Sequence, residues 1–489
     1  MKTKILFYCM LSVMLTVMNS CNSFLDITPE EIPSIDNAFR NRQEARKFLY
    51  GCYSYMPLFA DAGSNPAMFG GDEAWYRDPS VGFSPRLWHI ALGNQGSNAP
   101  IYNCFASKTD GELQGGTPMF TALSDCNIFL ENIHLPYDLQ EWERLIWTGE
   151  VKFLKAFYHF WLFRMYGPIP LIRENLPMDA PSGEVQRYRE PVDKVVEYIV
   201  ELLDEAIELL PDMIDNPSED LGRPTKLIAM ALKAQVLCYG ASPLFNNNRD
   251  EPFASYTDNR GTHLFPQTDA TEELRKWEKA AEALKAVIDY AHARNHALYD
   301  YSTTRDAIGL DPKTIYAMQV RGAATEPEEY NPEIIWADYN SNTIALQRAC
   351  FAAYDNTQMY VDGKNYGVPM KIVEQFFTKN GVPIEEDREW AGVNFTDFRT
   401  ATTDDRQYIS QNQKTYALHF DREPRFYSSI FFDKGTNYGN GRLGDNTSNP
   451  NYMFVFSLEL NVPNQPAHFF RTSTTGYIAK KMLYFRSSA

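Results

Sequence analysis

Residues 149–172 read Gly149-Glu-Val-Lys-Phe-Leu-Lys-Ala-Phe-Tyr-His-Phe-Trp-Leu-Phe-Arg-Met-Tyr-Gly-Pro-Ile-Pro-Leu-Ile172, and this stretch decides the fold. Two apolar stripes at helical spacing run along it, one through Val151, Leu154, Tyr158, Trp161 and Met165 and one through Phe153, Phe157 and Phe160. A helix that is apolar on two faces is buried on two sides. Gly167-Pro168 ends it, because proline cannot continue the hydrogen-bond ladder. Asp138 and Glu141 have capping-box spacing, so we expect a helix of roughly 28 residues that starts near Leu139.

Helical periodicity also marks five other segments, so the fold class is mostly α. These segments are residues 41–56, where Asn41 and Glu44 have capping-box spacing, and residues 123–133, 192–209, 225–239 and 277–291. Small residues at packing positions, such as Ala231, allow close antiparallel helix pairs, and the family resemblance given below implies that these pairs are tetratricopeptide-like. Residues 58–116 have no sustained period, and an ordered loop of that length is usually functional.

The composition changes near Asp300, where Gly, Pro, Asn, Thr and Tyr become frequent. We expect isolated strands or extended segments at 333–336 and 453–456, a short helix at 371–377, and an extended segment or strand at 425–432. The sequence therefore divides into a helical region (37–299) with a loop insertion (58–116), followed by an irregular α+β region (300–489).

The start of the chain has the features of an export signal. Lys2 and Lys4 precede the apolar run 5–17, which is too short for a membrane anchor, and Met18-Asn-Ser-Cys21 is similar to a lipobox. We expect residues 1–20 to be a signal peptide, Cys21 to be lipidated, and residues 21–36 to be the tether. The alternative is an ordinary signal peptide that leaves Cys21 as a chance thiol.

Composition and motifs exclude several function classes. The net charge of −17 argues against a nucleic-acid partner, which requires clustered basic residues. Beyond Cys9 and Cys21, five cysteines remain without a CxxC pair, so we expect neither a disulfide framework nor a zinc site. The sequence has no His-Glu-x-x-His, P-loop, Gly-x-Ser-x-Gly or Gly-x-Gly-x-x-Gly motif. We expect His159 to be a core histidine, and we expect no catalytic residue, metal site or cofactor.

Eight stretches in order resemble the SusD/RagB-like family, surface lipoproteins of Bacteroidetes that capture nutrients. They are the stretch quoted above together with Cys21–Asp26, Asp125–Ile133, Gly222–Leu227, Ala231–Tyr239, Pro332–Trp336, Glu423–Tyr427 and Thr475–Tyr477. The resemblance implies an outer-membrane, surface-exposed location and a SusC-like TonB-dependent transporter as partner. It also implies a further C-terminal helical pair that residues 300–489 do not match, and a helical array without its last pair exposes an apolar face.

The loop Phe69-Gly-Gly-Asp-Glu-Ala-Trp-Tyr-Arg-Asp78 carries the candidate ligand site. Aromatic faces stack on sugar rings, and carboxylates and guanidinium groups bond hydroxyls, while Gly70-Gly71 allows the backbone to present them. The candidate binding residues are Asp72, Trp75, Tyr76, Arg77 and Trp88, with Tyr339 and Asn340 as weaker candidates. The alternative is that these aromatics only brace the loop, and for Trp88 we favour that interpretation.

The sequence therefore predicts a lipid-anchored glycan-binding protein that delivers oligosaccharides to the transporter and has no catalytic role. Three alternatives stay open: a peptide-binding RagB-like lipoprotein, an α/α-toroid glycoside hydrolase, and a scaffold lipoprotein without a small ligand. The irregular half after Asp300 argues against the toroid, which stays helical to its end.

Overall fold

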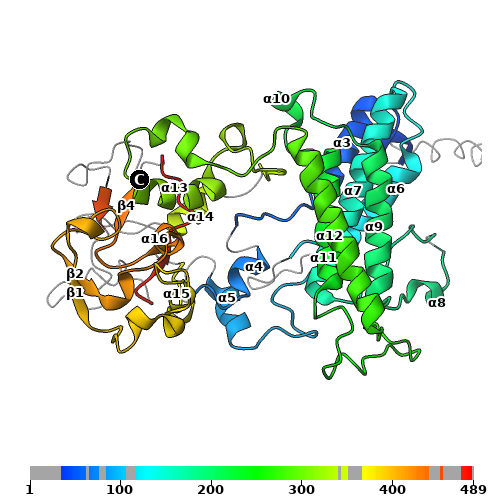
Figure 1. Cartoon of the computed structure of the whole chain (residues 1–489). Coiled ribbons are helices and arrows are strands. Elements are labelled where there is room, and N and C mark those ends of the chain that lie inside the picture. The colour runs from blue at the N-terminus through cyan, green and yellow to red at the C-terminus, as the bar shows by residue number, and fades with distance from the viewer. Residues whose placement is uncertain are drawn as a thin grey trace, which may run out of the picture.

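The computed structural model describes residues 35–61, 65–75, 84–105, 116–177, 179–339, 343–350, 366–439, 452–454 and 475–486. These residues form two lobes with a short segment between them (Figure 1). We call residues 35–61 and 116–299 the helical lobe and residues 301–486 the second lobe. The mostly-α class is confirmed. In the part of the chain that is described, no helix is long and apolar enough to cross a membrane.

The helical lobe and the segment between the lobes contain only helices as regular structure among the described residues. The helices are α2 Ile35–Ala38, α3 Arg42–Tyr53, α4 Pro66–Phe69, α5 Ser84–Ala91, α6 Met119–Asn132, α7 Glu141–Tyr166, α8 Ser182–Val185, α9 Val192–Leu209, α10 Pro217–Asp220, α11 Lys226–Ala241 and α12 Ala270–His292. The long helices form a row in which α3 packs on α6, α6 on α7, α7 on α9, α9 on α11, and α11 on α12. All six predicted helices are present.

The second lobe combines short helices with two-stranded antiparallel sheets. Its α-helices are α13 Pro312–Thr325, α14 Thr343–Ala349, α15 Met370–Gln375 and α16 Pro424–Ser429. Its 3-10 helices are η1 Tyr301–Thr303, η2 Arg305–Ala307, η3 Glu328–Tyr330, η4 Ile384–Glu386, η5 Arg388–Trp390, η6 Thr403–Asp405 and η7 Ala417–His419. Its strands are β1 Phe398–Thr400, β2 Lys414–Tyr416, β3 Ile430–Phe431, β4 Thr436–Tyr438, β5 Tyr452–Phe454 and β6 Ile478–Ala479. The pairs are β1–β2, β3–β6 and β4–β5.

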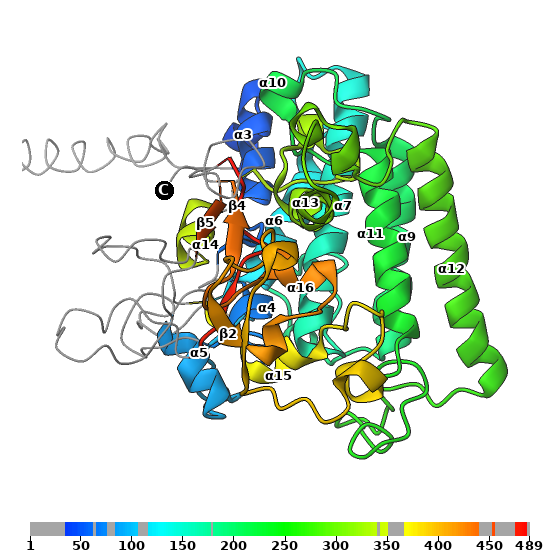
Figure 2. The ribbon, with the colours of Figure 1, turned by 60° about the vertical axis from the view of Figure 1, so that its left-hand side comes forward.

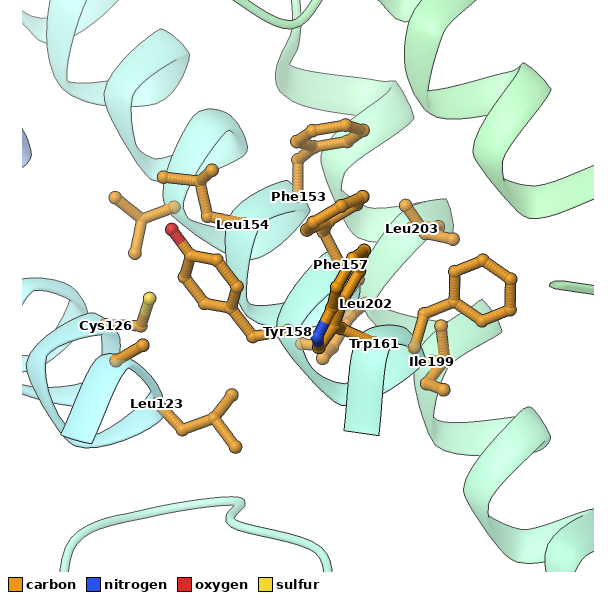
Figure 3. Packing of buried hydrophobic residues seen from close by; sticks show 14 of the residues in the cluster. Leu123, Cys126, Phe153, Leu154, Phe157, Tyr158, Trp161, Ile199, Leu202 and Leu203 are labelled. Carbon is orange, nitrogen blue, oxygen red and sulfur yellow. The ribbon is translucent and has the colours of Figure 1, made fainter. Parts of the chain in front are cut away.

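Helix α7 is the centre of the helical lobe, as its double stripe predicts. Figure 3 shows Phe157 and Trp161 of α7 among side chains of α6, such as Leu123, and of α9, such as Leu202. Both α7 side chains are nearly fully buried. Because α7 is buried on two sides, it needs an apolar stripe on each of them.

The ends of α7 agree with the prediction at one end only. Gly167 ends the helix with a positive φ of 68°, which glycine adopts without steric cost. The predicted capping box at the start is wrong: Gln140 is the N-cap, and no side-chain bond caps the helix there. Asp138 is occupied elsewhere, because its Oδ1 accepts a hydrogen bond from the Arg42 backbone N–H at 2.6 Å.

Glu150 of the 149–172 stretch and Arg223 of the Gly222–Leu227 stretch form a buried ion pair in the helical lobe. Glu150 on α7 accepts two hydrogen bonds from Arg223, at 2.6 Å from Nη2 and 3.0 Å from Nε. The Tyr53 hydroxyl of α3 donates a third bond to Glu150 at 2.6 Å. Next to it, a Cβ at Gly149 would lie 2.9 Å from Leu209 Cβ, so glycine lets the end of α9 approach α7. These residues therefore join α3, α7 and α9 to the linker before α11.

Helix α12 is present as predicted, but its large apolar side chains do not form its buried face. The face packed on α11 consists mainly of small residues and valine, including Ala283, Val287 and Ala291. Trp277, Leu284 and Ile288 are exposed instead. The stripe that indicated a helix thus faces solvent.

Two expectations for the second lobe need correction, and one helix was missed. Residues 424–429 form helix α16, and only Ile430–Phe431 of the expected extended segment is strand. Residues 333–336 form no strand, and the Trp336 ring instead packs edge-on against Phe153 at 5.3 Å. The sequence also missed α13, although Asp311 caps it and Pro312 occupies its first turn. The expected helix at 371–377 is α15, and β5 agrees with the expected strand near 453.

Candidate functional site

The segment between the lobes holds the predicted aromatic residues Trp75 and Trp88. Their ring centroids lie 4.8 Å apart at an interplanar angle of 54°, and both rings are half-buried against the helical core. The Trp75 backbone N–H donates to the Gly367 carbonyl at 2.8 Å, and the Gly367 N–H donates back at 2.9 Å. Trp75 therefore joins the helical lobe to the second lobe, and it has a bracing role whatever else it does.

Asp72 lies three residues before Trp75 on the same exposed turn. Its side chain is 79% exposed and lies 3.7 Å from the Lys371 ammonium of α15. Residues 70–73 are all exposed, as a ligand loop requires. Asp72 and Lys371 thus offer an acceptor and a donor on the turn that leads to Trp75, one from the segment between the lobes and one from the second lobe.

Tyr339 makes a different set of contacts. Its ring lies against Gly222, where φ is +91° and a Cβ would be 3.2 Å from Tyr339 Cδ2. Its hydroxyl donates to the Glu328 carboxylate. Burial and this bond raise the pKa of Tyr339 above its ordinary value. The structure therefore does not join Tyr339 to the Trp75 and Trp88 pair through any contact among the described residues.

A cavity of about 590 Å³ lies beside Tyr339. It is bounded by the linker before α11, the end of α12 and residues 328–337, and its lining includes Arg294, His296 and Trp336. The Trp336 Nε1–H donates to the Gly222 carbonyl at 3.0 Å, which fixes the ring in the wall. The volume is within the usual range for small-ligand pockets. The sequence analysis did not predict these three residues as site residues. The tryptophan of the Pro332–Trp336 stretch was the one feature that could have indicated them.

Four candidates lie outside the described residues: Tyr76, Arg77 and Asn340 as ligand residues and Cys21 as the lipidation site. Their roles stay predictions.

Among the described residues, no group of three His, Cys, Asp or Glu side chains is placed to hold a metal ion. His159 is the core histidine that the sequence predicts. Its Nδ1 lies 2.8 Å from the Lys155 carbonyl, and the Ile172 backbone N–H donates to Nε2. Burial lowers the pKa of His159 to about 3, so the ring is neutral. The five cysteines beyond residue 21 are all free thiols, and Cys52 and Cys126 are fully buried in the core.

Two family models match the chain. The model described as "Starch-binding associating with outer membrane" matches residues 87–237, and the model described as "SusD family" matches residues 332–488. A curated relative, SusD-like protein P25 of Formosa agariphila, is 22% identical over 221 residues. That match covers 44% of this chain and only 40% of the relative.

Several solved structures share the fold. BT4246 superposes with a TM-score of 0.66 at 23% identity, covering 92% of this chain and 74% of that one. For the SusD-like protein BF3747 of Bacteroides fragilis the TM-score is 0.61 at 17% identity, over 93% of this chain and 72% of that one. For the SusD-like carbohydrate binding protein BF0978 of the same species it is 0.52 at 13%, over 91% and 68%.

The first family model covers α5 to most of α11, and the second covers most of the second lobe. The two matches and the shared fold agree with the eight motif stretches, and the chain belongs to the SusD/RagB family.

Proposed function

We propose that this protein binds glycans at the cell surface, with the turn around Asp72 and Trp75 as part of the binding surface. The observation that carries this proposal is the half-buried Trp75 ring three residues after Asp72, whose exposed carboxylate pairs with Lys371. A sugar offers an apolar ring face and a rim of hydroxyl groups, which need an aromatic surface and hydrogen-bonding partners of both kinds. The starch-binding description of one family model and the carbohydrate-binding title of BF0978 support the same ligand class.

We also propose that the protein is lipid-anchored in the outer membrane through Cys21 and delivers its ligand to a SusC-like TonB-dependent transporter. Support comes from the lipobox-like Met18–Cys21 and from the outer-membrane association in the description of the family model. An anchor of more than one acyl chain is needed for stable attachment.

Calorimetry of the full chain against a panel of starch, laminarin and host glycans tests the ligand class. Trp75→Ala should reduce affinity for the best glycan about tenfold, since a stacked ring contributes ~1–2 kcal/mol. The control is Phe398→Ala, because Phe398 is an exposed aromatic side chain on the β1–β2 hairpin. A lower melting temperature for Trp75→Ala with unchanged affinity would leave only the bracing role.

The same panel separates the alternatives. Binding of peptides instead of glycans would favour the RagB-like interpretation, and hydrolysis products would favour the hydrolase. If the protein neither binds nor hydrolyses any ligand of the panel, the scaffold interpretation is favoured. For the anchor, Cys21→Ala should move the protein out of the membrane fraction. Retention there with incorporation of a labelled fatty acid would contradict lipidation at Cys21.

A further inference from the structure

The end of the helical lobe at the turn between α6 and α7 carries exposed apolar side chains. Figures 1 and 2 both show α3 and α10 at this end of the lobe. Single exposed apolar side chains are ordinary, but several large ones at one end of a molecule mark an interaction surface. Four side chains from the turn and from the first turns of α7 form this surface, which we call the apolar tip: Leu135, Tyr137, Trp142 and Leu145.

The N-terminal part of the described chain enters the helical lobe at the apolar tip. Helix α2 begins at Ile35, which is itself exposed, and leads directly into α3. At the start of α3 the Arg42 backbone N–H donates to Asp138, in the turn that carries Tyr137. The Arg42 guanidinium donates to Glu143 in the first turn of α7, with Nη2 2.6 Å from Oε1. The apolar tip therefore lies where the chain from Cys21 reaches the folded lobe.

We propose that the apolar tip lies in the headgroup region of the bilayer that holds the lipid anchor, a proposal that rests on the proposed anchor at Cys21. The chain between Cys21 and Ile35 can span at most about 50 Å. Helix α7 has 26 residues and leads away from the apolar tip for about 39 Å. The apolar tip is therefore the end of the lobe that the anchor holds closest to the membrane.

The side chains of the apolar tip suit the boundary between acyl chains and headgroups. Tyr137 is 83% exposed and Trp142 is 60% exposed. Tyrosine and tryptophan are favoured at this boundary, because the ring enters the apolar layer while the O–H or N–H group bonds to headgroups and water. Leu135 and Leu145 add apolar area on either side in the sequence. Apolar contact of this kind adds to the attachment that acyl chains give.

Exposed cations beside the apolar tip pair with carboxylates of their own helices. Lys47 lies 2.8 Å from Glu44 on α3, and Arg144 lies 2.8 Å from Glu141 on α7. These pairs carry no net charge, so the contact depends mainly on apolar area. We therefore expect it on a zwitterionic phosphatidylcholine bilayer, without a requirement for anionic lipid.

Quenching of tryptophan fluorescence by lipids brominated on their acyl chains tests the proposal. A chain in which a hexahistidine segment replaces residues 1–21 is held on phosphatidylcholine vesicles by a nickel-chelating lipid, so the test does not require lipidation at Cys21. We expect brominated vesicles to quench part of the emission, and Trp142→Phe should remove most of the quenched part. Trp277→Phe is the matched control and should keep it, because Trp277 is exposed on α12, at the outer edge of the row of helices in Figure 2.

A second pair of variants tests whether the apolar tip itself makes the contact. Tyr137→Asp should lower the quenched fraction at least twofold, because a carboxylate does not enter the acyl region. Ile308→Asp is the control, since Ile308 is 80% exposed in the second lobe. Both sites are exposed, so both variants should keep the melting temperature of the parent protein.

Three results would overturn the proposal. They are a parent protein that brominated lipid does not quench, quenching that Trp142→Phe leaves unchanged, and quenching that Tyr137→Asp leaves unchanged. In the first case the apolar tip would be left as a surface for a protein partner. Failure of the anchor at Cys21 is a separate result, because it would appear as missing fatty-acid incorporation in the natural chain while the nickel-held protein is still quenched.

Discussion

The two lobes bury charged side chains in different ways. In the helical lobe, Arg223 is neutralised by Glu150, whose side chain is 2% exposed. In the second lobe, Arg321, Arg422 and Lys480 are buried, and the hydrogen bonds of their side chains go mainly to backbone carbonyls. The carbonyls inside regular helices are already bonded, so a cation buried against helices alone needs a carboxylate.

Irregular backbone leaves carbonyls without partners, and a long cationic side chain can satisfy several of them. Arg422 donates to the carbonyls of Val373, Phe376 and Leu418, at 2.8, 2.6 and 3.0 Å. Lys155 supports the same rule inside the helical lobe, because its Nζ donates to the carbonyl of Arg173, which lies in a non-helical segment, at 2.6 Å. Buried backbone carbonyls of the second lobe are thus bonded by cationic side chains, whereas those of the helical lobe are bonded within the helices.

The largest expected effect is at Arg422. Arg422→Met should lower the free energy of unfolding by about 4–6 kcal/mol, because each buried carbonyl left without a donor costs about 1–3 kcal/mol. Guanidinium denaturation measures the loss. The control is Arg425→Met, where the side chain is 59% exposed and pairs with Glu423. A loss below about 1 kcal/mol at Arg422 would mean that water satisfies these carbonyls and that the contrast between the lobes is unfounded.

The ion pair of the helical lobe should behave differently when both partners are removed. Arg223→Met alone should cost about 3–5 kcal/mol, because it leaves the Glu150 carboxylate buried without a cation. Burial raises the pKa of Glu150, and the loss of Arg223 would raise it further. Adding Glu150→Leu should recover at least ~2 kcal/mol, as measured in a double-mutant cycle. Additive losses would show that the two side chains act independently.

Acid should weaken both lobes through one buried histidine in each. Burial lowers the pKa of His159 and of His419 to about 3, from an ordinary value of 6.5. Between these values the unfolded chain binds protons that the folded chain does not. Stability is therefore full above pH 6.5 and falls toward pH 3, by about 1.4 kcal/mol per pH unit for each histidine. His159→Gln should reduce the proton uptake on unfolding by one, and so make the dependence of stability on pH less steep. Denaturation between pH 4 and 7 measures this change. An unchanged slope would show that other groups dominate the acid response.

The sequence predicted the long helices that carry large apolar side chains at helical spacing and missed α13, whose buried face is mostly polar or small. Helix α13 buries Thr314, Met318, Arg321 and Gly322, so its helical spacing carries little hydrophobic signal. Helix α12 was found from its exposed face, because its inner face relies on alanine. In both cases a neighbouring element, which periodicity cannot show, decides which face is buried.

The candidate site was predictable only as a region. The long aperiodic loop indicated Asp72 and Trp75, but the partners of these residues, Lys371 and Gly367, are far along the chain and no local pattern links them. The same holds for the cavity beside Tyr339, which three separate segments form. Residues in one helix can be related by spacing, whereas residues that meet across lobes require the tertiary structure.

The smallest expected effect on stability is at the ion pair between the segment that separates the lobes and helix α15 of the second lobe. Asp72 and Lys371 are both largely exposed, with side chains 79% and 75% accessible, so Asp72→Ala should change the free energy of unfolding by less than about 0.5 kcal/mol. If the lobes are joined by the Trp75–Gly367 bridge, the melting temperature should stay constant. Affinity for the best glycan should nevertheless fall several-fold, because a hydroxyl of the ligand loses a charged acceptor. Lys371→Ala is the paired variant and should act in the same direction through the lost donor. Calorimetry and thermal melting of both variants decide the point: unchanged affinity in both would remove this turn from the binding surface, and a large fall in melting temperature would make the ion pair a structural joint between the lobes.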